Sequence, residues 1–332
     1  MIVKERIKTG ILGSGAAARI HANALKDCPE RELVGAYSPD TEGLKQFAAE
    51  YGVKAFESRE ALFQACECIH ICTPSGMHFQ DSCECLERGL HVMCEKPVCM
   101  TAEEGEQLLE VLEHAEGHFM PIAQCRYSDS YRKVQNALAD GRLGELVGAQ
   151  VEVMYYRSPE YYSGSCWRGN KKDDGGVMMN QAIHYIDMIV GLLGKPVSVT
   201  ATAANRLHRI ESPDTISALV EFESGMTTVM MLSTAASPGY PGRYTIYGTQ
   251  GSLCVEENRI VEHGVQEAPS HTGFRDPGGI SMELHAREFE EFSQVIHRGI
   301  DQTYTAREAI EAIRLIEAAF LAAEENRKVF LQ

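Results

Sequence analysis

The feature that most constrains this chain is a glycine-rich loop after its first apolar run. Residues 7–12 are apolar and β-branched, which predicts a strand, and residues 16–26 are rich in alanine, which predicts a helix. The loop between them follows a G-x-G-x-x-A pattern in Gly13-Ser14-Gly15-Ala16-Ala17-Ala18. The first glycine of such a loop allows a tight turn, the second lets a pyrophosphate approach the backbone, and the small third residue lets helix and strand pack closely. The pattern predicts a dinucleotide site built from Gly13, Gly15, Ala16 and Ala17, with a merely glycine-rich turn as the alternative.

The first 124 residues alternate between strand-like and helix-like segments. We expect strands over residues 7–12, 32–37, 55–56, 68–72, 90–94 and 121–125, and helices over residues 16–26, 41–50, 58–64, 78–88 and 102–114. Alternation of this kind is typical of βαβ units and a parallel sheet. The sequence therefore predicts a doubly wound parallel sheet of the α/β class over residues 1–124, the dinucleotide-binding domain.

The rhythm of the sequence changes near residue 125. We expect helices over residues 131–140, 176–193, 282–298 and 305–326, and strands over residues 148–157, 197–204, 215–223, 226–233, 244–248 and 252–255. Short turns such as Glu223-Ser224-Gly225 join neighbouring runs, which is the pattern of an antiparallel meander. Residues 125–332 should therefore form a second α/β domain with a large, mostly antiparallel sheet.

A charged pair stands at the end of a strand that should be buried. Glu95-Lys96-Pro97 directly follows the apolar residues 90–94. Charges are seldom placed beside buried backbone unless something nearby needs them, and ligands of open parallel sheets bind outside the carboxyl ends of the strands. Glu95 and Lys96 are therefore candidates for a ligand site, and a surface pair in a turn closed by proline is the alternative.

Two further strand ends fall on the same predicted edge. Ser38 and Asp40 follow the strand over residues 32–37, at the place where an acidic residue would read the adenosine ribose of NAD. No arginine follows to grip the 2′-phosphate of NADP, so the pattern favours NAD and leaves NADP open; Asp40 is either a ribose ligand or a turn residue. Thr73 and Pro74 end another strand, and His78 opens the next helix. We predict cofactor contacts at all five residues, with a structural role as the alternative for His78.

The second domain carries a stripe of polar residues on an apolar helix. Asn180, His184 and Asp187 are spaced i, i+4 and i+7 in the helix expected over residues 176–193, so they should line one face. A lone histidine on an apolar helix is more often a core residue, but three polar groups on one face favour a functional site. We predict that Asn180 and His184 contact the substrate.

An aromatic and basic segment precedes this helix. Seven such residues crowd into it: Tyr155, Tyr156, Arg157, Tyr161, Tyr162, Trp167 and Arg168. Aromatic faces beside arginines suit a sugar ring that carries a carboxylate or a phosphate. Arg157, Trp167 and Arg168 are the candidate substrate-binding residues, and a core or subunit contact is the alternative for Trp167.

Charge and composition exclude several classes of protein. The net charge of −16 argues against nonspecific binding to nucleic acid or to anionic membranes, and no apolar run approaches the roughly 20 residues that span a bilayer. Residues 1–9 alternate in charge and contain no signal-peptide core, which predicts a cytoplasmic protein. The eleven cysteines lack the C-x-x-C spacing of zinc sites, so we expect reduced thiols and no metal.

Together these motifs resemble the Gfo/Idh/MocA family of pyridine-nucleotide oxidoreductases. The resemblance extends over essentially the whole chain and rests on four patterns: Gly13-x-Gly15-x-x-Ala18, Thr73-Pro74, Glu95-Lys96-Pro97, and Gly175-Gly176 followed by His184-x-x-Asp187. It implies an N-terminal Rossmann domain with an NAD or NADP cofactor, and hydride transfer at a hydroxyl or ketone of a sugar, polyol or nucleotide sugar. It also implies that the C-terminal domain binds substrate and assembles homodimers or homotetramers through its sheet.

The resemblance further implies residue roles. Lys96 would contact the nicotinamide ribose and the reacting oxygen, and His184 would be the acid/base. Many polyol-oxidising members have an aspartate four residues before that histidine, where this chain has Asn180, which can orient a hydroxyl but cannot take a proton. Residues 161–169 and 180–187 look more like the branch that oxidises C3 of UDP-N-acetylglucosaminuronate.

Two other functions remain as alternatives. A glycosidase of the same fold would use bound NAD for transient oxidation and elimination, and would hydrolyse an aryl glycoside without net NADH production. A nonenzymatic nucleotide-sensing regulator on this scaffold would be expected to lose the lysine and the histidine, and both are present here.

Overall fold

A computed structural model describes residues 6–263 and 281–331, so the first five residues of the charged N-terminal segment lie outside the described residues. The chain divides into two compact units. The first combines residues 1–124 with residues 280–309, and the second combines residues 125–279 with residues 310–332. The segment 280–309 therefore belongs to the first unit, whereas the sequence predicted that every residue after 124 belongs to the second domain.

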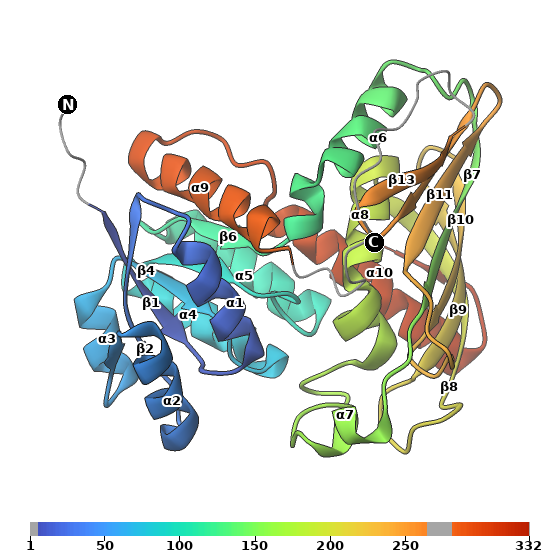
Figure 1. Cartoon of the computed structure of the whole chain (residues 1–332). Coiled ribbons are helices and arrows are strands. Elements are labelled where there is room, and N and C mark those ends of the chain that lie inside the picture. The colour runs from blue at the N-terminus through green and yellow to red at the C-terminus, as the bar shows by residue number, and fades with distance from the viewer. Residues whose placement is uncertain (1–5, 264–280, 332) are drawn as a thin grey trace. The chain divides into compact units, whose positions relative to one another are not determined.

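The first unit is built on a parallel sheet with the strand order β3-β2-β1-β4-β5-β6 (Figure 1). Its strands are β1 (Ile7–Leu12), β2 (Arg31–Tyr37), β3 (Lys54–Ala55), β4 (Cys68–Ile71), β5 (His91–Cys94) and β6 (Phe119–Pro121). All neighbouring pairs are parallel. This is the Rossmann strand order, in which the chain leaves β1 toward β2 on one side and returns to β4 on the other. The predicted doubly wound parallel sheet is confirmed.

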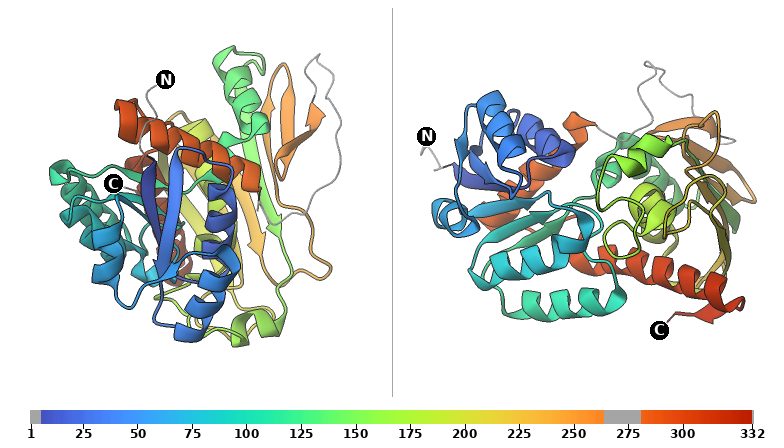
Figure 2. Two further views of the ribbon diagram at one scale, coloured as in Figure 1. Left: turned by 60° about the vertical axis from the view of Figure 1, so that its left-hand side comes forward. Right: turned by 90° about the horizontal axis from the view of Figure 1, so that it is seen from below.

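Helices cover both faces of this sheet (Figure 2). They are α1 (Ala16–Leu25), α2 (Thr41–Tyr51), α3 (Arg59–Ala65), α4 (His78–Glu87), α5 (Ala102–His114) and α9 (Met282–Arg298), with a short 3-10 turn at Ser75–Met77. The helix α9 packs against α1 because its apolar positions recur at helical spacing. Phe289, Phe292 and Val295 enter the same buried cluster as Ile11 and Phe47.

One strand of the first unit differs from its prediction. The last strand was expected over residues 121–125, but β6 ends at Pro121 and a 3-10 turn occupies Gln124–Tyr127. The backbone pairing with β5 begins at Phe119, two residues before the expected start. Apolar residues continue on both sides of Pro121, so the hydrophobic pattern alone did not set the register.

The second unit contains a larger sheet with the strand order β13-β12-β11-β7-β10-β9-β8-β14. Its strands are β7 (Leu146–Met154), β8 (Pro196–Ala204), β9 (Thr215–Phe222), β10 (Thr227–Ser233), β11 (Arg243–Gly248), β12 (Ser252–Glu256), β13 (Arg259–His263) and β14 (Val329–Phe330). The sheet is antiparallel apart from the pairing of β10 with β7. The predicted mostly antiparallel sheet is confirmed.

The helices of the second unit lie on one face of its sheet (Figure 1). They are α6 (Asp129–Ala139), α7 (Pro159–Ser163), a π-helical segment (Val177–Ala182), α8 (Ile183–Leu193) and α10 (Ala306–Glu325). Strand residues alternate accordingly: Val220 and Met230 are fully buried, while Leu219, Val229 and Met231 are about half exposed on the other face. Leu219, Val229 and Met231 thus form an apolar row on this outward face, which is unusual for a surface that contacts only water.

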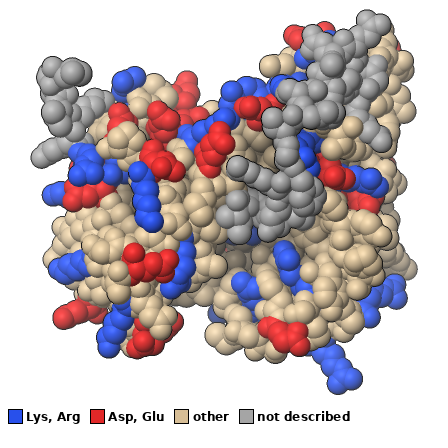
Figure 3. Space-filling view, viewed as in Figure 1, with Lys and Arg blue, Asp and Glu red and all other residues tan. Residues whose placement is uncertain are grey.

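No helix in the described residues is long and apolar enough to cross a membrane. On the face shown in Figure 3, basic and acidic side chains are interspersed rather than gathered by sign. A protein that binds nucleic acid nonspecifically needs a basic stripe. The charge pattern on this face gives no sign of one.

Candidate active site

The carboxyl ends of four parallel strands lie level at one edge of the first sheet. Leu12 pairs with Tyr37 and with Ile71, and Ile71 pairs in turn with Cys94. The segments that follow these four positions are the glycine loop and those that begin at Ser38, Cys72 and Glu95. The predicted cofactor-side residues of the first unit therefore leave the sheet from one edge, where ligands of such sheets bind.

The glycine loop has the two properties that a pyrophosphate site needs. Gly13 adopts φ 112°, and a Cβ atom there would lie 2.5 Å from the carbonyl oxygen of Cys72, so only glycine fits against the end of β4. At Gly15 a Cβ atom would meet nothing within 4 Å. Protein packing thus gives no reason for glycine at position 15, whereas close approach of a ligand would. No side chain caps the helix α1 at Gly15, so its N-terminal N–H groups and dipole are available to an anion.

The residues after β2 are partly used by the protein itself. Asp40 is the N-cap of α2, and its Oδ1 accepts a hydrogen bond from Gly43 N at 3.0 Å. Ser38 is buried, and its Oγ accepts from Asp40 N at 3.3 Å. Asp40 therefore has the turn role that the sequence offered as an alternative, and its carboxylate remains exposed at the ligand edge.

His78 links two loops of the ligand edge to one another. Its side chain is buried; Nδ1 lies 2.7 Å from the carbonyl oxygen of Pro97, and Nε2 lies 2.8 Å from that of Thr73. Thr73 also donates from Oγ1 to Asp81 at 2.7 Å. Both ring nitrogens of His78 thus face backbone carbonyls, and the ring fixes the Thr73-Pro74 loop against the segment that follows β5.

Glu95 is held from behind by a buried histidine. Its Oε1 lies 3.2 Å from His21 Nε2, and its Oε2 accepts from the backbone N–H of Lys96 at 3.1 Å. Burial would raise the pKa of Glu95, but the hydrogen bond from His21 and the charge of Lys96 outweigh it and hold the pKa well below its ordinary value. Glu95 is therefore a carboxylate at all physiological pH values. Lys96 follows it, half-buried, and precedes a cis peptide bond to Pro97.

The polar stripe predicted in the second unit is divided by a change of helix type. The segment Val177–Ala182 is π-helical, with i→i+5 spacing, and the α-helix begins only at Ile183. Asn180 and His184 are half-buried. Asp187 instead lies in the core, where its carboxylate accepts from Arg126 Nε at 2.7 Å and Arg126 Nη2 at 2.9 Å. A buried arginine therefore binds both oxygens of Asp187, and the shared face of Asn180, His184 and Asp187 stays a prediction.

Asn180 is oriented by a carboxylate that the sequence analysis did not single out. Its Nδ2 donates to Asp174 Oδ1. Asp174 is fully buried, and its Oδ2 accepts from Gly176 N at 3.3 Å. A carboxylate therefore does stand beside the asparagine, on the loop that leads into the helix rather than on the helix itself.

The predicted arginines and aromatic residues form one cluster in the second unit. Arg157 donates from Nη2 to Gln181 Oε1 at 2.8 Å, and Gln181 donates to Tyr161 at 2.8 Å. The Arg168 guanidinium lies 3.9 Å from the centre of the Tyr161 ring and 5.3 Å from that of Trp167. We call Arg157, Tyr161, Trp167, Arg168 and Gln181 the aromatic–arginine cluster. Two cations are held here on aromatic faces, and Gln181 joins them to the segment that carries His184.

Three contributors escaped the sequence analysis. His21, Asp174 and Gln181 each hold a predicted site residue. His21 carried a weak signal, as the one histidine in an alanine-rich helix after a glycine loop. Asp174 and Gln181 carried none, because a hydrogen bond to a neighbouring polar residue leaves no periodic mark in a sequence.

The comparisons with known proteins agree with this geometry. Residues 7–122 match the family described as oxidoreductase family, NAD-binding Rossmann fold, and residues 131–254 match the GFO/IDH/MocA C-terminal domain. The chain belongs to the Gfo/Idh/MocA family. It is therefore an NAD-binding oxidoreductase, and the resemblance seen in its motifs is confirmed.

Several members of the Gfo/Idh/MocA family align with this chain over nearly its whole length. The WlbA dehydrogenase of Chromobacterium violaceum, solved with NADH and UDP-GlcNAcA, is 29% identical with a TM-score of 0.90, and the alignment covers 100% of this chain and 97% of that one. The WlbA dehydrogenase of Bordetella pertussis, solved with the same two ligands, is 26% identical with a TM-score of 0.90, over 100% and 99%. Inositol 2-dehydrogenase of Rhizobium meliloti is 27% identical over 97% of this chain and 98% of its own length.

Proposed function

We propose that this protein transfers a hydride between NAD and a hydroxyl or ketone carbon of a sugar, and that its substrate class is a nucleotide sugar acid. The observation that carries the proposal is the position of Lys96. It follows β5 at the carboxyl edge from which the glycine loop leaves β1. A lysine at that edge can reach the reacting end of a dinucleotide whose pyrophosphate lies on the loop.

The first unit is the proposed dinucleotide-binding domain. The pyrophosphate would lie on Gly13, Gly15 and the N–H groups of Ala16 and Ala17, where a Cβ atom at position 15 would otherwise stand. Ser38 and Asp40 would bind the adenosine ribose, and Thr73, Pro74 and Glu95 would line the nicotinamide end. His78 would contribute by fixing the two loops that form this end. When bound, NAD supplies the ring that accepts or returns the hydride.

In the proposed mechanism, His184 transfers the proton and Lys96 stabilises the charge on the reacting oxygen. His184 takes the hydroxyl proton as the alcohol is oxidised and returns it when the ketone is reduced, because an imidazole suits proton transfer near neutral pH. Lys96 donates a hydrogen bond to the same oxygen as it becomes a carbonyl. Asn180, held by Asp174, orients the sugar hydroxyl.

The substrate class follows from the aromatic–arginine cluster. Arginine forks bind carboxylates and phosphates in bidentate geometry, and the flanking rings offer faces for a sugar or a base. Arg157 and Arg168 place two positive charges in the second unit, although the whole chain has a net charge of −16. The two WlbA dehydrogenases, which share the fold over the whole chain, were solved with a nucleotide sugar acid.

The test is an assay of NAD reduction with matched pairs of substrates. A nucleotide sugar acid should be oxidised faster than the same nucleotide sugar without its carboxylate, and faster than inositol. Lys96→Met should lower turnover by a factor of about 10² or more, while Lys45→Met, an exposed lysine on α2, should leave it unchanged. Near-normal turnover by Lys96→Met would remove the assignment of this lysine. Hydrolysis of an aryl glycoside without net NADH would replace the function by that of the glycosidase.

The second unit is also the proposed assembly surface, in a homodimer or homotetramer. The exposed face of its sheet places Val229 opposite Leu219 on β9, and Met231 is the next outward residue on β10. Such a row is covered in most stable proteins. Light scattering should show a monomer for Val229→Lys/Met231→Lys, and an unchanged mass for Lys26→Glu on the other unit.

We further propose that the enzyme works in the cytoplasm, because none of its eleven cysteines forms a disulfide.

A further inference from the structure

A row of buried polar groups lies behind Glu95 in the first unit. Arg31 Nη1 lies 3.2 Å from His70 Nε2, His70 Nδ1 lies 2.9 Å from His21 Nδ1, and His21 Nε2 lies 3.2 Å from Glu95. His21 and His70 have no exposed surface, and Arg31 is 3% exposed. Solvent therefore does not reach these groups, and their hydrogen bonds must come from neighbouring side chains; of the four residues' polar atoms, Arg31 Nη2 is buried without a partner. The proposed function uses none of them except Glu95.

The arginine fixes the direction of every bond in this row. A guanidinium can only donate, so His70 Nε2 must accept and the proton of a neutral His70 must lie on Nδ1. That proton points to His21 Nδ1, which must accept in turn. The proton of His21 therefore lies on Nε2 and is donated to Glu95 Oε1. Any other arrangement would place two N–H groups, or two lone pairs, against one another.

The charges along the row agree with this direction. Burial, together with the nearby positive charges, holds the pKa of His70 well below its ordinary value, so the ring stays neutral. Within the part of the chain that the structure describes, Arg31 forms no ion pair. Its other hydrogen-bond partners are Ser293 Oγ at 2.9 Å and Cys68 Sγ at 3.3 Å, and its guanidinium lies 5.3 Å from the centre of the Phe292 ring. A buried guanidinium is costly without an anion. Glu95, at the far end of the row, is the carboxylate to which it is connected.

The geometry points to a one-directional relay, Arg31→His70→His21→Glu95, in which the three buried residues position the Glu95 carboxylate and, through it, the backbone of Lys96. This inference rests on the proposed function, because Lys96 is the residue that the relay would position for catalysis. Arg31, His70 and His21 are positioning residues, since they reach the reacting end only through Glu95.

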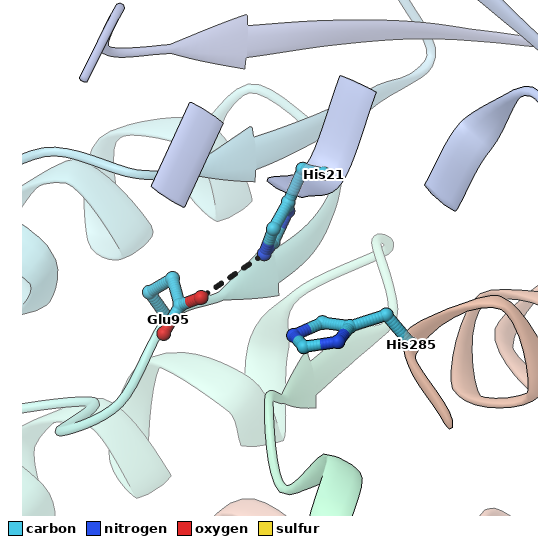
Figure 4. Close-up of side chains that lie close together, drawn as sticks. All are labelled: His21, Glu95 and His285. Atoms are coloured by element: carbon cyan, nitrogen blue, oxygen red, sulfur yellow. Dashed lines mark hydrogen bonds and ion pairs between the residues drawn. The ribbon is translucent and has the colours of Figure 1, made fainter. Parts of the chain in front are cut away.

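A metal ion is the competing occupant of this place. Ligand atoms of His21, Glu95 and His285 lie within 4.8 Å of one another, and Figure 4 shows both rings facing the carboxylate from α1 and α9. Two histidines and a carboxylate can hold zinc. To bind it, however, His21 Nε2 would have to lose its proton, and Nδ1 would then carry a proton directed at the Nδ1–H of His70. The relay and the metal site therefore exclude one another.

Substitutions of His70 separate an oriented relay from a merely buried ring. In His70→Gln the amide oxygen can accept from Arg31 and the amide nitrogen can donate to His21, so the direction is kept. His70→Met offers neither group. We expect His70→Gln to retain kcat/KM within about 3-fold, and His70→Met to lower kcat/KM by about 10- to 100-fold. Ser293→Ala removes a polar partner of Arg31 that lies outside the row and is the matched control, with no change in kcat/KM expected.

Nitrogen NMR of the histidine rings reports which ring nitrogens carry protons, and it needs no substrate. In the wild-type protein at neutral pH, the His70 ring should be neutral with its proton on Nδ1, and the His21 ring should carry its proton on Nε2. Arg31→Met should make the His21 ring a mixture of tautomers, and Arg31→Lys should restore the single form. A His21 ring with its proton on Nδ1 in the wild type would overturn the relay even if no variant folds.

Two further results would also overturn it. One is stoichiometric zinc binding that shifts the His21 signals, which would establish the metal site instead. The other is a His70→Met variant with wild-type kcat/KM. Failure of the proposed function looks different: no sugar would be oxidised by the wild-type enzyme, while the ring tautomers of His21 and His70 would stand as predicted.

Discussion

The two units hold their polar residues in different ways. In the first, buried rings fix the ligand edge from behind: His78 joins two loops through backbone carbonyls, and His21 holds Glu95. In the second, Arg157 and Arg168 are half-buried and lie on aromatic faces. Fully satisfied buried hydrogen bonds specify one geometry, whereas a cation over a ring tolerates several. The contrast predicts that the proposed cofactor side is rigid and that the proposed substrate side tolerates substitutions more readily.

The largest expected effect concerns the ion pair Arg126–Asp187 of the second unit. This pair is an exception to the contrast, because it is buried like the polar groups of the first unit. Arg126 and Asp187 are almost fully buried, and Asp187 lies in the same helix as His184. Arg126→Met should lower the free energy of unfolding by about 3–5 kcal/mol, because it removes the guanidinium that binds both oxygens of a buried carboxylate. Arg243→Met, which breaks the exposed pair with Glu152, should cost about 0–1 kcal/mol. Chemical denaturation of both variants measures the difference, and equal losses would show that burial does not distinguish the two pairs.

A smaller effect is expected at the buried ring of the first unit. His78→Leu removes the buried ring whose two nitrogens contact the carbonyl oxygens of Thr73 and Pro97, and should cost about 1–3 kcal/mol of unfolding free energy. The same variant should bind NAD more weakly, as calorimetry can show, because both loops lie at the ligand edge. His114→Leu, an exposed change on α5, is the control. Unchanged NAD binding by a folded His78→Leu would mean that the loops need no support.

A still smaller effect is expected from the stacked arginines. Arg168→Ala removes a cation from the Tyr161 face, a contact worth about 0.5–1 kcal/mol of unfolding free energy at an exposed site, and should raise KM for any substrate that the arginine binds. If the substrate carboxylate also binds there, the loss should be larger for a sugar acid than for its uncharged counterpart. Steady-state kinetics of Arg168→Ala with both substrates measure the two losses. Equal losses would leave Arg168 with a packing role only.

The smallest effect is a change in pH dependence. Burial, with His118 beside it, lowers the pKa of His91 to about 4 from an ordinary value of 6.5. Between these two pH values the unfolded chain binds more protons than the folded one, so stability falls as the pH falls from 6.5 to 4. His91→Gln should flatten part of this loss, as urea titrations across the window would show. A slope identical to that of the wild type would contradict the shift.

Much of the fold could be predicted because it depends on patterns of period two and period 3.6. The alternation of residues 7–114 indicated a parallel sheet, and the turns after residue 196 indicated an antiparallel one. Two features lacked such a pattern. The π-helical segment at Val177–Ala182 has the same apolar composition as an α-helix, and the return of α9 to the first unit depends on contacts between distant segments.

The residues proposed to contact the ligands could be predicted from the sequence, and the residues that support them could not. Gly13, Gly15 and Lys96 stood out because glycine and charge are unusual where they occur. The pairing of Asp187 with Arg126 could not be predicted, because helical spacing says which residues share a face but not which arginine from another segment binds one of them. The site roles stay predictions until the kinetic tests are made.

The order in which the chain visits the two units has a practical consequence. The helix α9 comes after almost the whole second unit, yet its His285 lies beside His21, its Ser293 bonds Arg31, and its aromatic residues complete the first core. A fragment cut after residue 124 would therefore lack part of its own interior. Anyone who wishes to exchange cofactor halves between relatives must move two stretches of sequence together, or rejoin them by circular permutation.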